Sequence, residues 1–243
     1  MNIIKLNAID STNRFLKELT QEASPENYTI VVANNQTDGK GQRGASWISE
    51  SDKGLTFSML YKNSPNKTSN LFLLNCIVAL SVVEALKKLT SIEFQIKWPN
   101  DILAENKKIG GILIENSIKN QHEIVSIIGI GINVNQSQFD NLPQASSLAI
   151  LKKQPFDKEE ILLKIAQQLQ FNLENVQEES ADYYWKRYHD LLYKRGIVSA
   201  FEDVQGNRFV GKIIAVTTEG KLQLELENNV ISFFDLKEIK MLF

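Results

Sequence analysis

The segment EIVSIIGIGINVN, from Glu123 to Asn135, consists mostly of β-branched residues and glycine. A run of this kind is typical of a central strand that is buried on both faces. Gly129 and Gly131 interrupt it, although glycine inside a strand weakens packing. Two interpretations stay open: a β-bulge, or a gap in the packing that leaves room for a flat or bulky ligand. Asn133 follows and offers an amide donor and acceptor to the edge of a heterocycle.

The segments on either side of this strand predict a mixed sheet. IGGILIEN is expected to pair with Ile102-Leu103 as a hairpin across AENKK (Ala104 to Lys108). Further strands are predicted at YTIVVA, LTFSMLY and FQIKW, and Pro99 ends the last of them. Helices are predicted at RFLKEL, 70–86, 158–176 and 181–192. We therefore expect an α+β fold with mostly antiparallel strands and helices packed on one face.

Helix starts are marked by polar residues that can accept hydrogen bonds from free backbone N–H groups. Asp10, Ser11 and Thr12 precede the first helix, and Thr68 or Ser69 precedes the second. The chain changes character near Lys194, after which three or four short strands alternate with the turns QGN, TEG and ENN. We expect two domains, residues 1–193 and residues 194–243, the second docked on the first because so small a β unit is marginal alone.

Composition excludes several classes of function. The net charge of −2 over 243 residues gives no basic field for nucleic acid or an anionic membrane. Cys76 is the single cysteine, so no intramolecular disulfide forms, which fits a reducing cytoplasm. The most apolar segment, 70–86, is too short and too interrupted to span a membrane. His122 and His189, the only histidines, lie in no metal or triad pattern.

The stretch TDGKGQRGASW, from Thr37 to Trp47, contains three glycines and two cations but no apolar residue before Ala45. Glycine lets a backbone approach a ligand closely, and N–H groups together with cations suit an anion such as a phosphate. It matches neither the dinucleotide fingerprint nor the P-loop. The alternative is a mobile hairpin loop, although Trp47 at its end is typical of an anchor.

Two further motifs contain charged or polar side chains that could bind a ligand. KWPND, Lys97 to Asp101, places a cation, an amide and a carboxylate at a strand edge; the alternative is a strand end with an Asx-type turn. KKIGGILIE begins with Lys107 and Lys108 and contains two adjacent glycines. One lysine is expected in a solvated turn and the other at a pocket edge, as a point cation for a phosphate or carboxylate.

Taken together and in order, these motifs resemble the biotin–protein ligases. The resemblance covers nearly the whole chain and rests on DSTN (Asp10 to Asn13), QTDGKGQRGASW, KWPND, KKIGGILIE and GIGINVN. The combination of KWPND and the glycine-rich loop distinguishes these ligases from the lipoate ligases, which share the fold but lack that combination. The resemblance implies a class II synthetase-like ligase domain with helices on a mixed sheet, plus a small C-terminal SH3-like β-barrel. It also implies the monofunctional form, without an N-terminal DNA-binding domain.

The implied reaction uses ATP to activate biotin as biotinyl-5′-AMP and then transfers biotin to a lysine of a biotin carboxyl carrier domain. Mg²⁺ is expected with the phosphates, near Asp101. We expect cytoplasmic localisation and binding neither to DNA nor to a membrane, and leave a homodimer open. The alternatives are a lipoate- or octanoate-type ligase or transferase of the same fold, and a non-catalytic sensor that binds biotin.

The resemblance assigns roles to residues of this sequence. The catalytic group is Lys108, Asp101 and Arg43. The biotin-binding group is Ser11, Thr12, Asn13, Gln36, Gly39, Lys40, Gly41, Gln42, Trp47, Lys108, Gly111 and Leu113. The ATP-binding group is Lys40, Arg43, Lys97, Asn100, Lys108, Gly129, Gly131 and Asn133. The loop is expected to fold over the ligand and exclude water from the anhydride.

The loop departs from the family pattern G-R-G-R-x-G, because Lys40 and Gln42 stand where arginines are usual. Glutamine offers only a neutral amide, whereas arginine makes charge-assisted bidentate hydrogen bonds to phosphate. Whether Lys40, Gln42 or Arg43 holds the phosphate stays open.

We predict that Gln42→Arg slows the dissociation of pre-formed, labelled biotinyl-5′-AMP into a trap by roughly tenfold, the scale of one charge-assisted hydrogen bond. Arg43→Ala should accelerate it if Arg43 substitutes for the missing arginine. An unchanged rate in Gln42→Arg would show that this position does not hold the phosphate.

Overall fold

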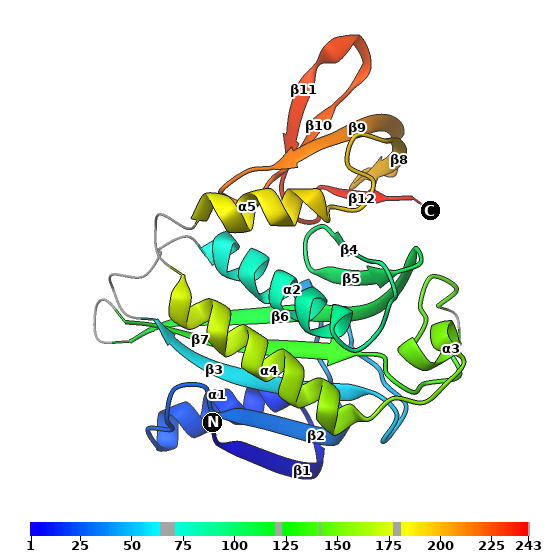
Figure 1. The fold of residues 1–243 in the computed structure, drawn as a ribbon. Coiled ribbons are helices and arrows are strands. Elements are labelled where there is room, and N and C mark those ends of the chain that lie inside the picture. The colour runs from blue at the N-terminus through cyan, green and yellow to red at the C-terminus, as the bar shows by residue number, and fades with distance from the viewer. Residues whose placement is uncertain (64–70, 120–122, 141, 177–180, 243) are drawn as a thin grey trace.

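The central strand of the fold is β7 (Glu123–Ile132), which occupies the middle of a seven-stranded sheet in the computed structural model (Figure 1). The structure describes residues 1–63, 71–119, 123–140, 142–176 and 181–242, without the side chains of Arg43, Asn63, Lys119 and Glu123. The strand order is β1-β2-β3-β7-β6-β5-β4. The other strands are β1 (Ile3–Ile9), β2 (Ile30–Gln36), β3 (Leu55–Asn63), β4 (Phe94–Lys97), β5 (Asp101–Ala104) and β6 (Lys107–Lys119).

The pairing of these strands confirms the predicted mixed, mostly antiparallel sheet. Among the described strands of this sheet, β1 and β2 run parallel and the other neighbouring pairs are antiparallel. The hairpin predicted around AENKK is present, but Ala104, Lys107 and Lys108 belong to its strands. The turn is therefore only Glu105 and Asn106, both with positive φ. No strand was predicted at β1, an edge strand in which no residue is fully buried.

Two long helices cover one face of the sheet, as Figure 1 shows. They are α2 (Leu71–Lys87) and α4 (Lys158–Asn175), which pack on each other beside α5 (Ala181–Asp190). Their core includes Phe57 and Met59 of β3 and Ile128 and Ile130 of β7. A short helix that was not predicted, α3 (Leu148–Lys152), has Ser147 as its N-cap. The expected cap of α2, Thr68 or Ser69, and His122 lie outside the described residues.

The prediction that the helices pack on one face is wrong, because α1 (Thr12–Glu22) lies on the opposite face. Its Leu16 packs with Val31, Leu60, Val125 and Ile127 in a separate buried cluster. Successive side chains of a strand point to opposite faces, so Val125 and Ile127 face α1 while Ile128 and Ile130 face α2 and α4. Gly129 and Gly131 continue the row that faces α1.

A second, five-stranded antiparallel sheet follows α5, in the order β11-β10-β9-β8-β12. It contains β8 (Val198–Asp203), β9 (Arg208–Val216), β10 (Leu222–Glu225), β11 (Ile231–Phe234) and β12 (Ile239–Met241). Its core is continuous with that of the first sheet. The three or four predicted strands become five because the three-residue β12 was too short to detect. The domain boundary between residues 193 and 194 stays a prediction.

Specific hydrogen bonds join the second sheet to the first. Trp98 Nε1 donates to the carbonyl of Gly220 at 2.9 Å. The backbone N–H of Val216 donates to His189 Nε2 at 2.9 Å, while His189 Nδ1 lies 2.8 Å from the carbonyl of Trp185. His189 therefore links α5 to β9, a structural role that its sequence context did not reveal.

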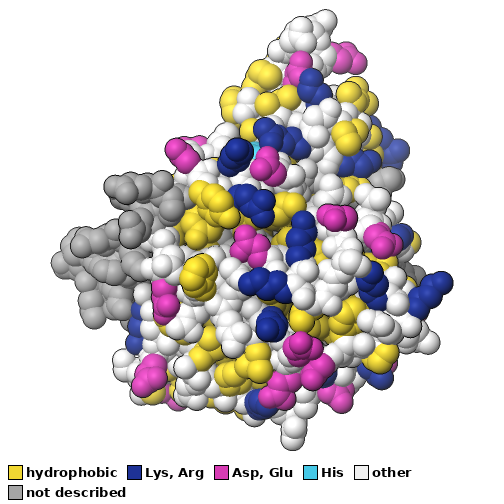
Figure 2. Space-filling model, viewed as in Figure 1, with side chains coloured by type: hydrophobic (Ala, Val, Ile, Leu, Met, Phe, Trp, Pro, Cys, Tyr) yellow, Lys and Arg dark blue, Asp and Glu magenta, His cyan; other side chains and the backbone are white. Residues whose placement is uncertain are grey.

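Basic and acidic side chains are interspersed on the face shown in Figure 2, without a large area of one sign. That distribution agrees with the net charge of −2. Among the described helices, none is long and apolar enough to cross a membrane.

We predict that Leu16→Ala lowers the free energy of unfolding by about 2–5 kcal/mol, because it leaves a cavity at a fully buried position between α1 and the sheet. Urea denaturation measures this change. Phe171→Ala, at a side chain that is 61% exposed on α4, serves as the control and should change it by less than about 0.5 kcal/mol. Equal effects would show that α1 does not pack on this face.

Candidate active site

A cavity of about 400 Å³ is lined by most of the residues that the sequence analysis assigned to a site. Its walls include the start of α1, the loop after β2, and strands β2 to β7. The predicted residues in its lining are Ser11, Thr12, Asn13, Gln36, Lys40, Gly41, Gln42, Trp47, Lys97, Asn100, Asp101, Lys108, Gly111, Leu113, Gly129 and Gly131. The fold thus brings together motifs separated by more than a hundred positions in the chain.

The floor of the cavity is a group of glycines on adjacent strands. Gly111 of β6 lies opposite Gly131 of β7, and Leu113 lies opposite Gly129. The register of β7 is continuous with both neighbours through these positions, so the β-bulge interpretation is wrong. The irregularity lies instead between Ile102 and Leu103, where β5 pairs with β6.

In this structure the space above the glycines holds side chains of the protein itself. A Cβ on Gly131 would overlap the indole of Trp47, and one on Gly129 would overlap the amide of Asn13. A Cβ on Gly111 would lie 3.3 Å from Trp47 Cζ3. The Trp47 Nε1 is buried and has no acceptor among the described residues. An unpaired buried donor costs about 1–3 kcal/mol. A new hydrogen-bond acceptor, or a move to a position where the N–H has one, would therefore stabilise the indole.

One end of the cavity is polar and hydrogen-bonded. The backbone N–H and hydroxyl of Thr12 donate to Gln36 Oε1 at 2.7 and 3.0 Å. The hydroxyl of Ser58 lies 2.7 Å from Thr12 Oγ1 and 2.6 Å from Asn13 Oδ1. Asn13 Nδ2 donates to Glu115 Oε2 at 2.7 Å. The start of α1, where Ser11 is the N-cap, fixes these groups against β2, β3 and β6.

Ser58 and Glu115 belong to this network, although the sequence analysis assigned them no role. The polar residues Thr56 and Ser58 alternate with apolar ones in LTFSMLY. That alternation was a detectable signal, since two polar side chains on one face of an otherwise apolar strand require partners.

The other end of the cavity carries charged side chains. Lys108 Nζ lies 2.6 Å from Asp101 Oδ1 and 5.7 Å from the centre of the Trp47 ring. Burial lowers the pKa of Lys97, the nearby Asp101 carboxylate opposes that shift, and Lys108 adds to it. Lys107 is directed elsewhere, because its Nζ donates to the carbonyl of Pro143. Of the two lysines in KKIGG, Lys108 is therefore the one at the cavity.

Three predicted residues are absent from the described lining. The carbonyl of Gly39 accepts a hydrogen bond from the backbone N–H of Trp47 at 2.9 Å. Asn133 Nδ2 donates to the carbonyl of Ser146 at 3.0 Å. The side chain of Arg43 lies outside the described residues. Asn100 does line the cavity, with its amide bonded to the carbonyl of Ile112.

The second sheet supplies a wall that the sequence analysis did not anticipate. Its contribution is mainly apolar, with two lysines: Phe201, Ile213, Leu222, Leu236, Lys237, Ile239, Lys240 and Met241. These residues belong to a segment whose short strands carried no site motif, so only the docking of the two sheets reveals their position.

The described residues do not fit a metal ion held by the protein itself. No cluster of three or more His, Cys, Asp or Glu side chains occurs among them. Asp101 is a single carboxylate that is already paired with Lys108. Mg²⁺ accompanying the phosphates of ATP therefore stays a prediction.

The site is thus arranged for an elongated molecule with a polar head and an anionic tail. Leu113, beside the polar network, and Gly111, beside Lys108, are two residues apart on β6, which corresponds to about 7 Å. A ligand on the glycine floor can reach both ends, with its head at Asn13 and its charge at Lys108.

Comparisons with known proteins agree with this geometry. Residues 6–134 match the Biotin/lipoate A/B protein ligase family. The chain is 32% identical to the bifunctional ligase/repressor BirA of Bacillus spizizenii, over 94% of this chain and 71% of that protein. It is 26% identical to the biotin–[acetyl-CoA-carboxylase] ligase of Mycobacterium tuberculosis, over 66% and 59%. The structure of the Aquifex aeolicus biotin protein ligase in complex with biotin and ATP superposes with a TM-score of 0.81 at 30% identity, covering 99% and 98% of the two chains.

We predict that Gly131→Ala displaces the Trp47 indole, because the new Cβ would overlap the ring. Acrylamide quenching of Trp47, measured in a Trp98→Phe/Trp185→Phe background, should increase clearly. Gly111→Ala, whose Cβ would lie 3.3 Å from the ring, serves as the graded control and should change it less. Unchanged quenching in Gly131→Ala would show that the indole does not rest on the glycine floor.

Proposed function

Because this chain belongs to the Biotin/lipoate A/B protein ligase family, we propose that it activates biotin with ATP and joins it to a lysine of a carrier domain. The observation that favours biotin is the polar end of the cavity, where Thr12, Asn13 and Gln36 meet Ser58 and Glu115. The related structure with biotin and ATP supports both substrates.

The proposed reaction has two steps. A carboxylate oxygen of biotin attacks the α-phosphorus of ATP, and the bond from that phosphorus to the bridging oxygen of pyrophosphate breaks. The product is the mixed anhydride biotinyl-5′-AMP. The neutral ε-amine of a carrier lysine then attacks the anhydride carbonyl, AMP leaves with the bonding electron pair, and the amine loses a proton. Water would destroy the anhydride, so the site must exclude it.

In this proposal the ring end of biotin binds at Ser11, Thr12, Asn13 and Gln36. These groups alternate between donors and acceptors, which suits a ring that also presents both. The chain of biotin lies along the glycine floor past Gly111 and Leu113. In the structure the groups at the polar end pair with one another. A polar ring can exchange those hydrogen bonds for its own, whereas an alkyl acid forms none with them, which disfavours it by about 0.5–1.5 kcal/mol for each hydrogen bond not made.

Lys108 is the proposed cation at the reacting atoms. The biotin carboxylate and the α-phosphate are both anionic, so a fixed positive charge between them lowers the barrier to their approach. In the structure Lys108 is paired with Asp101 at 2.6 Å, and the substrates would replace that carboxylate as its partner. Asp101 is then free to accept a hydrogen bond from the incoming lysine amine, its proposed catalytic role.

The remaining assignments concern ATP. Lys97 and Asn100 lie beside Asp101 in the cavity lining, and Lys40 lies in the loop. Gly129 and Gly131 leave space for the ligand once the Trp47 indole moves away. The side chain of Asn133 can hydrogen-bond adenine only after its hydrogen bond to the carbonyl of Ser146 breaks. Gly39, Gly41, Gln42 and Arg43 belong to the loop proposed to close. In the structure this loop is already held by hydrogen bonds from Gly41 N to Ala45 O and from Trp47 N to Gly39 O.

The proposed partner is the biotin carboxyl carrier domain of a biotin-dependent carboxylase. The name of the Mycobacterium tuberculosis relative, a biotin–[acetyl-CoA-carboxylase] ligase, supports it. Cytoplasmic localisation, a homodimer and the absence of DNA binding stay predictions.

We predict that pyrophosphate is released when the protein is incubated with ATP and biotin. Release with lipoate or octanoate should be at least about tenfold slower, as expected when one or two hydrogen bonds to the ligand are not made. Lipoate or octanoate giving the faster release would favour the alternative acyl ligase. Binding of biotin without pyrophosphate release would indicate a sensor.

We also predict that Lys108→Ala slows the first-turnover release of pyrophosphate by about 10²-fold or more, since it removes a preorganised charge at the transition state. Lys107→Ala is the matched control, because its Nζ is bonded to Pro143 outside the cavity. A harmless Lys108→Ala together with a damaging Lys107→Ala would contradict the assignment.

A further inference from the structure

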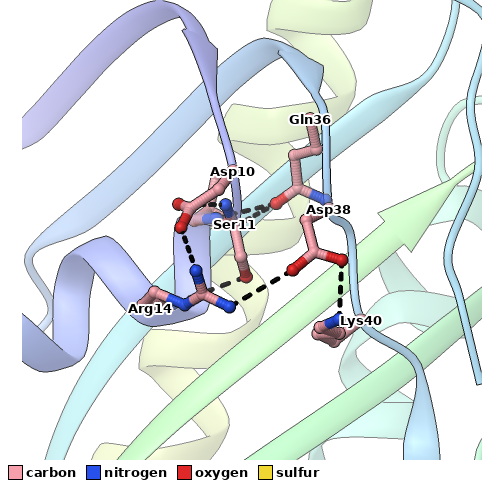
Figure 3. A network of polar contacts seen from close by, with 7 residues as sticks. Asp10, Ser11, Arg14, Gln36, Asp38 and Lys40 are labelled. Atoms are coloured by element: carbon pink, nitrogen blue, oxygen red, sulfur yellow. Dashed lines mark hydrogen bonds and ion pairs between the residues drawn. The ribbon is translucent and has the colours of Figure 1, made fainter. Parts of the chain in front are cut away.

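Four charged side chains connect the start of α1 to the glycine-rich loop, as Figure 3 shows. Arg14 in the first turn of α1 is paired with Asp10 and, at 3.2 Å, with Asp38 of the loop. Asp38 also accepts from Lys40 Nζ at 2.6 Å. The order Asp10–Arg14–Asp38–Lys40 alternates in sign, and Asp38 lies between two cations.

The backbone fixes this arrangement before any ligand binds. The N–H of Thr37 donates to the carbonyl of Ile9, and the N–H of Asp38 donates to the carbonyl of Asp10, both at 2.9 Å. Asp38 is therefore held against the N-terminal end of α1. The backbones of Lys40 and Ser46 pair in an isolated antiparallel bridge, which also fixes the position of the far side of the loop.

Lys40 is the only loop cation whose side chain the structure describes, and it lines the cavity. The hydrogen bond from Lys40 is the main cause that holds the pKa of Asp38 below its ordinary value; Lys40 and Arg14 also contribute through their charges. An aspartate with an ordinary or lowered pKa is ionised at neutral pH, so the negative charge of Asp38 offsets the positive charge of Lys40.

We propose that Asp38 is a positioning residue that competes with the phosphate of the acyl-adenylate for Lys40, and that Arg14 limits this competition by sharing the Asp38 carboxylate. The proposal rests on the proposed function. It adds a carboxylate within the loop to the effect predicted for the missing arginine at Gln42.

The expected effects are moderate, because these side chains are about half exposed. Exposed ion pairs contribute about 0.2–1 kcal/mol, which corresponds to roughly a 1.5- to fivefold change in a rate or affinity. Removing the charge of Asp38 should leave Lys40 to the phosphate alone. Removing Arg14 should leave Asp38 more strongly paired with Lys40.

The test is a double-mutant cycle on the dissociation of pre-formed, labelled biotinyl-5′-AMP into a trap. Asp38→Asn should slow dissociation about two- to fivefold, and Arg14→Ala should accelerate it about 1.5- to threefold. In a Lys40→Ala background, Asp38→Asn should have no effect. Asp52→Asn is the matched control, because Asp52 has a lysine partner, Lys158, at 2.7 Å but does not line the cavity, and it should leave the rate unchanged.

Two results would overturn the proposal. An unchanged or faster dissociation in Asp38→Asn would show that the carboxylate places Lys40 without competing for it. An equal slowing with and without Lys40 would show that Asp38 repels the intermediate directly. Absence of pyrophosphate release in the unaltered protein would instead overturn the proposed function and this inference with it, so the two failures are distinguishable.

Discussion

The structure depends on the register in which β6 pairs with β7. That register places Gly111 opposite Gly131 and Leu113 opposite Gly129, so three glycines lie together on one face of the β6–β7 pair. A shift of one residue would turn Ile112 and Ile130, which face the core beneath α2 and α4, toward the cavity. The same pairing therefore builds the hydrophobic core on one face and the floor of the site on the other.

The two ends of the site come from elements that this floor brings together. Packing of Leu16 sets α1 against the glycine face, and the first turn of α1 then carries Thr12 and Asn13 to Gln36, Ser58 and Glu115. At the other end the β5–β6 hairpin places Asp101 beside Lys108, and Trp47 of the loop covers the floor between the two ends. The polar network, the glycine floor and the charged pair thus follow one another along β6.

Much of this arrangement could be predicted from the sequence, because its signals are local. The apolar run with Gly129 and Gly131 identified the central strand, and the ordered motifs identified the family and most of the cavity lining. The sequence could not predict on which face of the sheet α1 packs, since an amphipathic helix fits either face of a sheet that is buried on both faces. Ser58, Glu115 and the Asp38–Arg14 pair were missed because their partners lie far away in sequence, and β12 because three residues carry no periodicity.

A cavity with a polar end, a glycine floor and a cationic end suits the attachment of biotin to a carrier domain. This function can be tested by the intact mass of a biotin carboxyl carrier domain after incubation with this protein, ATP, and equal concentrations of biotin, lipoate and octanoate. We expect a single mass increase, that of one biotinyl group, which disappears when the acceptor lysine is replaced. A lipoyl or octanoyl adduct as the main product, or an unmodified carrier, would contradict it.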